Sequence, residues 1–250
     1  MIIGAVWEYS IVQKEHRPYV VKKAWLKFQK FYTHHFLEPQ FESLGKGYAF
    51  MEPWHVQLFG GPIRVGNYAT FIANADKRIR LSVWPAQFGQ GRIQIGDYVL
   101  ICPGVRISAA QDIVIEDNCM LANNAYITDS DWHGIYNRVA MGQAAPVRLC
   151  KNAWIGDSAI VCKGVTVGEN SIIGAGAVVV SDVPANSVAA GNPARVVKEL
   201  DPTETFTTRA DWFADPAKLA RDFMKWEQAV LKGNTYFGWL RHLLFPRREK

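Results

Sequence analysis

The strongest constraint on this chain is a six-residue rhythm that runs from Leu149 to Gly191. Aliphatic side chains mark each step, and a small or β-branched residue follows four positions later. The aliphatic positions are Leu149, Ile155, Val161, Val167, Ile173, Val179 and Ala185, and the smaller ones are Ala153, Ala159, Val165, Ser171, Ala177, Val183 and Ala189. Neither the period of an α-helix nor simple β alternation produces this pattern. It predicts a β-solenoid of short strands and corners, with aliphatic side chains inside a narrow prism and Gly, Asn or Asp at the corners.

The chain resembles the hexapeptide-repeat acyltransferases in the segment WIGDSAIVCKGVTVGENSIIGAGAVVVSDVPANSVAAGNPARVVKEL. Within this group it is most similar to the sugar O-acetyltransferases and the xenobiotic acetyltransferases, over residues 62–200. The resemblance implies a left-handed parallel β-helix and a homotrimer with active sites between neighbouring subunits. It also implies acetyl-CoA or another acyl-CoA as co-substrate, and no metal ion.

The rhythm extends upstream with interruptions. It is lost over residues 74–92, which we interpret as irregular coil or a protruding loop, and it returns from Ile95. Between Ile113 and Ile115 it slips by two positions, which a two-residue insertion at one corner explains. Residues 128–146 form the longest interruption. A long excursion from a rigid scaffold is a typical location for functional residues.

We therefore predict a mainly β chain of three parts. An N-terminal cap covers residues 1–61 and contains an amphipathic helix over residues 17–37, where apolar residues recur at three and four. The β-helix acyltransferase domain covers residues 62–200. A C-terminal helical tail covers residues 201–250.

Both terminal parts combine apolar and basic residues. The N-terminal helix carries Lys22, Lys23, Lys27 and Lys30 between its apolar positions, and the tail ends in YFGWLRHLLFPRREK. In the tail, Asp215-Pro216 is typical of a helix start and Gly233 of a helix end. The N-terminal helix either covers the open end of the solenoid or lies on a membrane surface. The tail either packs against a neighbouring subunit or anchors the protein to a membrane.

Composition and charge add broad limits. The 250 residues are 49% hydrophobic and 20% charged, an ordinary globular balance, and the net charge of +5 suits polyanionic ligands such as coenzyme phosphates or a membrane surface. We find no nucleic-acid-binding motif. The cysteines lie inside repeat units without C-x-x-C spacing, at Cys102, Cys119, Cys150 and Cys162, which favours wall residues in a reducing compartment. With no signal peptide or membrane span recognised, we expect a cytoplasmic protein, at the inner membrane face if its ends bind lipid.

His133 is the candidate general base. It is the only histidine between Val56 and Leu200, and it lies in the long excursion within TDSDWHG. A lone histidine is often a surface or structural residue. In the similar acetyltransferases, however, a histidine just after an I-T/S-D segment is the general base, and the match implies that role for His133. Imidazole titrates near neutrality and can take the proton of a hydroxyl that attacks a thioester. Asp129, Asp131 or a backbone carbonyl could orient the ring, and we favour Asp131.

The resemblance also implies a coenzyme site. The amide of Asp157, after Trp154-Ile155-Gly156, matches the family's oxyanion donor, although the family residue there is usually small. Ala175 matches the coil that contacts the pantetheine arm. Two basic residues after N-P-A, Arg195 and Lys198, match those that reach the phosphate end. The chain has Val180-Ser181 where the family often has T-K, so that Lys163 is a candidate for the missing contact.

The acceptor is the least constrained part of the prediction. Asn124, with its neighbour Asn123, either hydrogen-bonds a polar acceptor or serves as a corner residue, and Asp129 is a second candidate acceptor contact. The predicted function is acetyl transfer to a hydroxyl of a sugar or glycan precursor, in polysaccharide biosynthesis. N-acetylation of an amino sugar would use the same base and coenzyme. A zinc carbonic anhydrase on this fold needs three histidines where the coils offer only His133. A non-catalytic scaffold would not need His133, Arg195 and Lys198 together.

Overall fold

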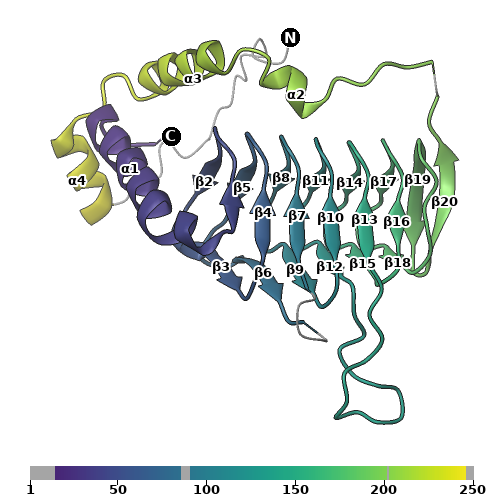
Figure 1. Ribbon diagram of the computed structural model, residues 1–250. Helices are drawn as coiled ribbons and strands as arrows, with labels where there is room; N and C mark the ends of the chain where they lie inside the picture. The colour runs from purple at the N-terminus through teal and green to yellow at the C-terminus, as the bar shows by residue number, and fades with distance from the viewer. Residues whose placement is uncertain (1–14, 86–90, 202, 246–250) are drawn as a thin grey trace. The chain divides into compact units, whose positions relative to one another are not determined.

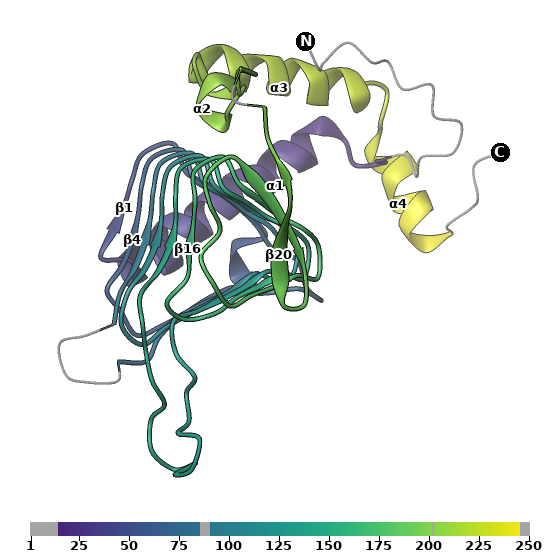
Figure 2. The ribbon, with the colours of Figure 1, turned by 90° about the vertical axis from the view of Figure 1, so that its right-hand side faces the viewer.

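A computed structural model describes residues 15–85, 91–201 and 203–245, and it divides the chain into two compact units. One unit is residues 29–214. The other combines the described residues of 1–28 with those of 215–250. The larger unit is a prism with a three-sided cross-section, built from three parallel sheets (Figures 1 and 2). The repeat that the sequence showed therefore forms the predicted solenoid.

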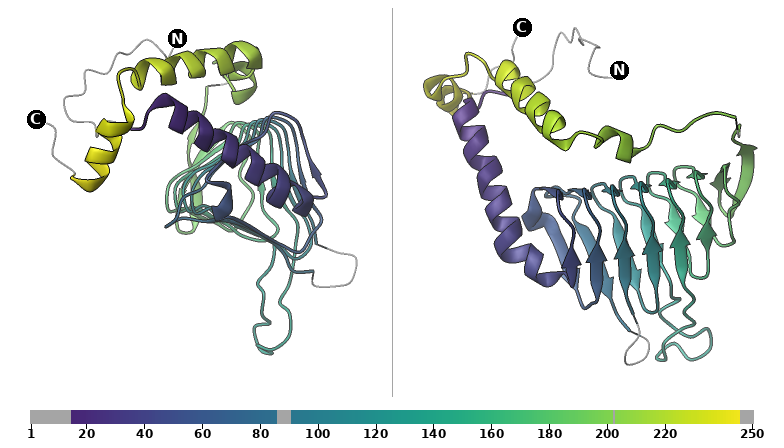
Figure 3. Two further views of the ribbon diagram at one scale, coloured as in Figure 1. Left: turned by 90° about the vertical axis from the view of Figure 1, so that its left-hand side faces the viewer. Right: turned by 45° about the horizontal axis from the view of Figure 1, so that its top comes forward.

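The strands of each sheet lie side by side along the prism (Figure 3, right), and from β1 to β18 every third strand of the chain joins the same sheet. Sheet A contains β1 (Ser43–Leu44), β4 (Ile63–Val65), β7 (Ile93–Ile95), β10 (Ile113–Ile115), β13 (Val147–Leu149) and β16 (Thr166–Val167). Sheet B contains β2 (Ala49–Met51), β5 (Thr70–Ile72), β8 (Leu100–Ile101), β11 (Met120–Leu121), β14 (Trp154–Ile155), β17 (Ile172–Ile173), β19 (Ser187–Gly191) and β20 (Ala194–Glu199). Sheet C contains β3 (Val56–Phe59), β6 (Ile79–Val83), β9 (Arg106–Ala109), β12 (Tyr126–Thr128), β15 (Ile160–Val161) and β18 (Val178–Val179). All the pairs are parallel except β19 with β20, which form an antiparallel ending.

The core is the column of side chains that point into the prism. The predicted inward residues from Leu149 to Val183 are all buried, and each fully buried Ile, Leu or Val contributes about 1.5–3 kcal/mol to folding. Ala185 is the exception, because it is exposed. After Val183 the chain turns outward before it enters β19, and Ser187 and Ala189 supply the inward positions there.

The slip in the rhythm corresponds to a longer corner, as predicted. A regular coil advances 18 residues, as between the paired residues Leu149 and Val167. Ile93 instead pairs with Ile113, a step of 20 residues. The two extra residues lie in the corner between β9 and β10, which leads from sheet C back to sheet A.

The solenoid begins earlier than the sequence rhythm indicated. The predicted boundary at residue 62 cuts off a complete first coil, since β1 already pairs with β4 through Ser43 and Arg64. Its buried residues include Phe41 and Phe50 beside Val56, so an aromatic side chain takes an inward position that is aliphatic in later coils. The rings of Phe50 and Phe71 stack at 4.4 Å between centroids. The stretch 74–92 also contains a regular strand, β6, whose alternating inward residues do not follow a six-residue step; residues 86–90 lie outside the described part.

The predicted N-terminal helix is present, and its end closes the first coil. Helix α1 (Tyr19–Tyr32) continues into a wider turn, η1 (Thr33–Leu37), and a tight one, η2 (Glu38–Gln40). Leu37 and Phe41 are buried in the core cluster of the first coil. Covering the end of the prism in this way shields the apolar interior from water.

The first residues of the predicted tail belong to the β-helix unit. Helix α2 (Arg209–Trp212) is fixed to the corners between sheets A and B. Arg209 Nε donates to the Tyr98 carbonyl at 2.6 Å, and its Nη2 donates to Thr70 Oγ1 at 3.0 Å. The Phe213 ring lies 5.5 Å from the Tyr68 ring. Residues 203–214 are therefore a strap on the solenoid rather than part of a separate helical tail.

The smaller unit is helical. Helix α3 (Pro216–Val230) begins as predicted, with Asp215 as its N-cap: the Asp215 carboxylate accepts the Lys218 N–H at 2.8 Å. Helix α4 (Tyr236–Leu244) follows, and the Asn234 side chain donates to the carbonyl of Arg17 at 3.0 Å. Among the described residues, no helix has the length and apolar character needed to cross a membrane.

Candidate active site

The predicted excursion is a hairpin arm that leaves the prism between β12 and β13, at the corner between sheets C and A (Figure 1). Backbone hydrogen bonds join its two sides. The Ala145 N–H donates to the Asp129 carbonyl at 2.9 Å, and the Asp131 N–H donates to the Gln143 carbonyl at 3.0 Å. Further out, the Gly134 N–H donates to the Ala140 carbonyl at 3.0 Å. The half of the arm next to the prism is therefore an ordered two-stranded ladder, and it carries His133.

Asp129 is a structural residue at the base of this arm, which corrects the prediction that it contacts the acceptor. Its side chain is fully buried. Its two carboxylate oxygens accept the backbone N–H groups of Ala110, Gln111 and Asp112 at 2.6–2.8 Å. Burial raises the pKa of the Asp129 carboxyl, while the three N–H donors act in the opposite direction. These bonds hold the lengthened corner between β9 and β10, so Asp129 has no exposed oxygen to offer an acceptor.

Replacing Asp129 should destabilise the protein. Asp129→Ala leaves three backbone N–H groups without their acceptor, and we expect a loss of about 3 kcal/mol in the free energy of unfolding. Asp131→Ala is a matched control, because it removes an exposed carboxylate from the same arm and should cost less than about 1 kcal/mol. Urea unfolding followed by circular dichroism measures both. Equal losses for the two variants would contradict the structural role of Asp129.

Trp132 sets the direction of the chain just before His133. Its backbone φ is 64°, a left-handed conformation that is uncommon for a bulky residue. Two hydrogen bonds hold it there. The Trp132 indole N–H donates to Thr128 Oγ1 at 3.0 Å, and the Trp132 backbone N–H donates to Ser130 Oγ at 3.0 Å. His133 is exposed on the arm, and its N–H donates to the Asp131 carbonyl at 2.8 Å.

Asp131 pairs with a lysine of the next coil, and its role in orienting the His133 ring stays a prediction. Its carboxylate lies 2.9 Å from Lys163 Nζ, and the described contacts include none between this carboxylate and the His133 imidazole. Lys163 stands at the sheet C to sheet A corner of the next coil, where the neighbouring Gly164 N–H also donates to the Ala145 carbonyl at 3.0 Å. The pair therefore ties the arm to the prism, and the coenzyme contact suggested for Lys163 stays a prediction.

A second group of predicted residues lies at the corner between sheets B and C. Asp157 and Ala175 occupy equivalent positions on consecutive coils, and the Gly176 N–H donates to the Asp157 carbonyl at 2.7 Å. The coils stack closely here, because a Cβ on Gly156 would approach the Ala175 nitrogen to 2.7 Å. The Asp157 carboxylate accepts the Ser158 hydroxyl at 2.6 Å. Among the described hydrogen bonds none uses the N–H of Asp157 or Ala175, so both amides are available to a ligand.

Asn124 is a corner residue one coil earlier. Its φ is 58°, its N–H donates to the Pro103 carbonyl at 2.9 Å, and its side-chain oxygen lies against Gly104. Asparagine adopts the left-handed conformation more readily than most residues. Asn124 is thus a corner residue, and a contact between its side chain and the acceptor stays a prediction.

The other predicted coenzyme residues lie toward the C-terminal end of the prism. Arg195 and Lys198 are exposed on β20, opposite Ala190 and Val188 of β19. Val180 is exposed directly after β18. They are thus on the same end of the solenoid as the Asp157 and Ala175 corner, since β19 pairs with β17.

The predicted base and the predicted oxyanion donor lie at opposite edges of sheet C within one chain. The arm and Lys163 are at the edge next to sheet A, whereas Asp157 is at the edge next to sheet B. Lys163 follows Asp157 by six residues, and strand β15 of sheet C lies between their two corners. Within one chain, sheet C therefore lies between His133, the predicted base, and Asp157, the predicted oxyanion donor.

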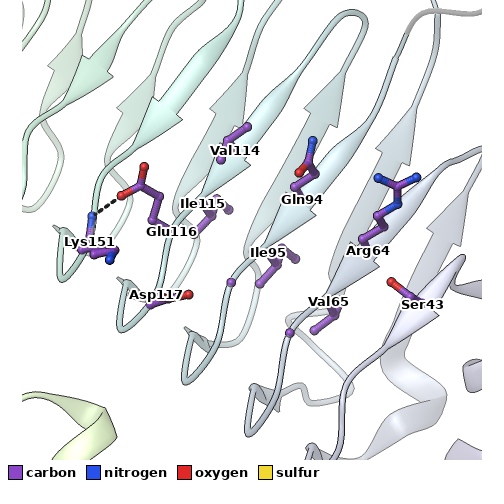
Figure 4. Close-up of a pocket in the computed structure, with 12 residues that line it drawn as sticks. Ser43, Arg64, Val65, Gln94, Ile95, Val114, Ile115, Glu116, Asp117 and Lys151 are labelled. Carbon is purple, nitrogen blue, oxygen red and sulfur yellow. Dashed lines mark hydrogen bonds between the residues drawn. The ribbon is translucent and has the colours of Figure 1, made fainter.

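A pocket of about 360 Å³ lies elsewhere, on the outer face of sheet A (Figure 4). It is lined by Arg64, Gln94 and Val114 from β4, β7 and β10, with Glu116 and Lys151 at one end. The Glu116 carboxylate accepts the Lys151 N–H at 3.0 Å and pairs with Arg148. None of the predicted site residues lines this pocket, and its second carboxylate, Asp117, also has a partner, since it accepts the Asp97 N–H at 2.8 Å.

Sequence reasoning missed the groups that support the arm. The bracing by Trp132, the Asp131–Lys163 pair and the corner held by Asp129 all depend on contacts with other coils. The available signals were the two-residue slip before Ile115, which marked a corner in need of support, and the bulky residue directly before His133.

Two families of hexapeptide repeats match the chain. The bacterial transferase hexapeptide family (six repeats) matches residues 146–181, and the hexapeptide repeat of succinyl-transferase matches residues 112–129. The galactoside O-acetyltransferase of Escherichia coli K12 is 30% identical over 165 residues, which cover 66% of this chain and 67% of that protein. A putative acetyltransferase of Saccharomyces cerevisiae is 36% identical over 118 residues, which cover 46% of this chain and 60% of that protein.

Solved structures give the same fold. A point mutant of AntD, an N-acyltransferase from Bacillus cereus in complex with dTDP and coenzyme A, superposes with a TM-score of 0.54 at 18% identity. The match covers 79% of this chain and 95% of AntD. The predicted fold, a left-handed parallel β-helix, is confirmed, and the chain belongs to the hexapeptide-repeat acyltransferase family.

Proposed function

We propose that this protein is an acetyl-CoA-dependent O-acetyltransferase that acts on a hydroxyl of a sugar or glycan precursor. The observation that carries the proposal is the placement of His133, exposed on a braced arm of a hexapeptide-repeat solenoid. The relative from Escherichia coli, a galactoside O-acetyltransferase, supports a sugar hydroxyl as the acceptor.

In this proposal His133 takes the proton of the acceptor hydroxyl. The oxygen attacks the thioester carbonyl of the acyl donor, the carbon–sulfur bond breaks, and the imidazolium returns the proton to the departing thiolate. General-base assistance of this kind contributes about 10²–10⁴-fold. The Trp132 contacts and the arm ladder fix the backbone that presents the imidazole, and Asp131 pairs with Lys163 beside it.

The acyl donor fits the other group of residues. The open amide of Asp157 is suited to stabilise the oxyanion that forms on the carbonyl, and the open amide of Ala175 is suited to the amide groups of a pantetheine arm. Arg195 and Lys198 provide exposed positive charge for the phosphates. The exposed Val180 offers an apolar contact where relatives often have a hydroxyl.

We propose further that the site is completed by a second copy of the chain, in a homotrimer. The separation of His133 from Asp157 across sheet C supports this, because an arm from one subunit could meet the sheet B to sheet C corner of the next. The arm tip is apolar and exposed: Tyr136 and Val139 are 99% and 96% exposed. In a closed ring of identical subunits, each contact joins one surface of a subunit to a different surface of its neighbour.

The cytoplasm is the proposed location. All four cysteines are free thiols, which fits a reducing compartment. Cys119 is buried, and burial raises its pKa to about 12, so that this thiol is not a nucleophile near neutral pH.

Acetyl-CoA binding, measured by calorimetry at low and moderate salt, tests the proposal when it is combined with a thiol-release screen of sugar acceptors. We expect saturable binding that weakens with salt, because the phosphates meet Arg195 and Lys198. Amine-bearing sugars in the same screen distinguish O- from N-transfer. A folded oligomer that does not bind acetyl-CoA would overturn the proposal.

Arg195→Ala should weaken acetyl-CoA binding by about tenfold, the effect of one charge-assisted contact to phosphate. Lys46→Ala removes an exposed cation from the first coil and should leave the dissociation constant unchanged. Dephospho-coenzyme A, titrated into both variants, shows whether the lost contact is to the ribose phosphate. A change in acceptor affinity alone would place Arg195 at the wrong end of the site.

A further inference from the structure

Helix α4 presents its apolar face to solvent. Phe237 is 76% exposed and Leu240 is 54% exposed, and Leu244 follows at the same spacing of three to four residues that defines one helix face. The other side of the helix carries Trp239 and His242, which are half-buried. The His242 ring stacks on His16 at 3.8 Å. The helix is thus held by its mixed face, and its apolar face is outward.

Helix α3 of the same unit shares this property. Neither α3 nor α4 has a buried residue, although α3 carries large apolar side chains. Met224, Trp226 and Val230 are all exposed. Large apolar surface that stays exposed on a folded unit marks an interaction site.

The helices of this unit carry more basic than acidic residues; in α3, Lys218, Arg221 and Lys225 stand with Asp222 and Glu227. Helix α4 contains Arg241 and no acidic residue, and the part of α1 in the same unit contains Lys22, Lys23 and Lys27 and no acidic residue. The sequence adds Arg247, Arg248 and Lys250 after α4, outside the described residues. Exposed aromatic and aliphatic side chains flanked by cations are the pattern of an interfacial helix.

We propose that the helical unit binds the surface of a membrane that contains anionic lipids. In this arrangement Phe237, Leu240 and Leu244 enter the boundary of the acyl chains, and Arg241 and the lysines of α1 meet the phosphate headgroups. A second copy of the chain is a poorer occupant, because two such surfaces would bring like charges together. The proposal concerns a surface separate from the residues assigned to acyl transfer.

Co-sedimentation of the full chain with vesicles tests this proposal. We expect binding to vesicles of phosphatidylcholine with phosphatidylglycerol, and much weaker binding to phosphatidylcholine alone. The double substitution Leu240→Glu with Leu244→Glu should weaken binding to the mixed vesicles by at least about 100-fold, because two apolar contacts are lost and two anionic side chains are added. Arg241→Glu should weaken it by about tenfold.

Matched controls separate this surface from general attraction to the vesicle. Lys46→Glu changes the net charge as Arg241→Glu does, and Met51→Glu adds an anionic side chain at an exposed apolar position of the β-helix; both should bind as the parent does. Equal loss in the controls, or no binding to anionic vesicles, would overturn the proposal. So would dissociation of the oligomer by the α4 substitutions in light scattering, since the face would then join copies of the chain. Acetyl-CoA binding by the α4 variants, measured in parallel, verifies that they are folded and tests acyl transfer independently.

Discussion

His133→Ala is expected to lose acetyl transfer by at least about 10²-fold in kcat, with its fold, oligomeric state and acetyl-CoA affinity retained. The side chain is exposed on the arm, so its removal leaves no cavity in the core. The backbone bonds of the arm and the Trp132 contacts do not involve the imidazole. The loss should therefore reflect the missing proton acceptor alone, measured as thiol release at saturating acetyl-CoA.

His34→Ala is the matched control. It removes another exposed imidazole, which pairs with Glu38 in the N-terminal cap, and it should leave turnover unchanged. Circular dichroism and acetyl-CoA calorimetry on both variants exclude misfolding as the cause of any loss. Parental turnover in His133→Ala would remove the assigned base, and the scaffold alternative would then have to be preferred.

Mixing two inactive variants is expected to restore about a quarter of the parental activity if each site takes its base from one subunit and its oxyanion corner from the next. His133→Ala retains the corner, and Ala175→Trp retains the base while a large side chain obstructs the corner. Ala175 is exposed and has an ordinary backbone, so the substitution should be tolerated. When the chains are unfolded together in equal amounts and refolded, about one site in four pairs an intact arm with an intact corner.

The alternative geometry gives a sharply different result. If His133 and Asp157 of the same chain acted together, every site in the mixture would carry one defect and activity would stay at the level of the single variants. The separation of the two groups by the width of sheet C argues for the composite site. Refolding each variant alone supplies the baseline, and analytical ultracentrifugation of the mixture measures how many subunits assemble.

Much of the solenoid could be predicted because its signal is local. In a β-helix each inward position recurs at a short, constant interval. The spacing of Ile155, Val161 and Val167 therefore predicts that they are buried, and they are. The same argument fails for the first coil. There an aromatic residue, Phe50, takes the inward position and stacks on Phe71 of the next coil, so a search for aliphatic residues alone passes over that step.

The candidate site, like the fold, could be predicted from the sequence only in part. The sequence alone determined the fold family, the longest excursion and His133 within it, because a repeat and its interruption are properties of neighbouring residues. Only the tertiary structure decided that Asp129 holds a corner, that Asp131 pairs with Lys163, and that the arm and Asp157 stand at opposite edges of one sheet. These outcomes depend on which coils stack and which groups are desolvated between them, and residues far apart in the chain settle both.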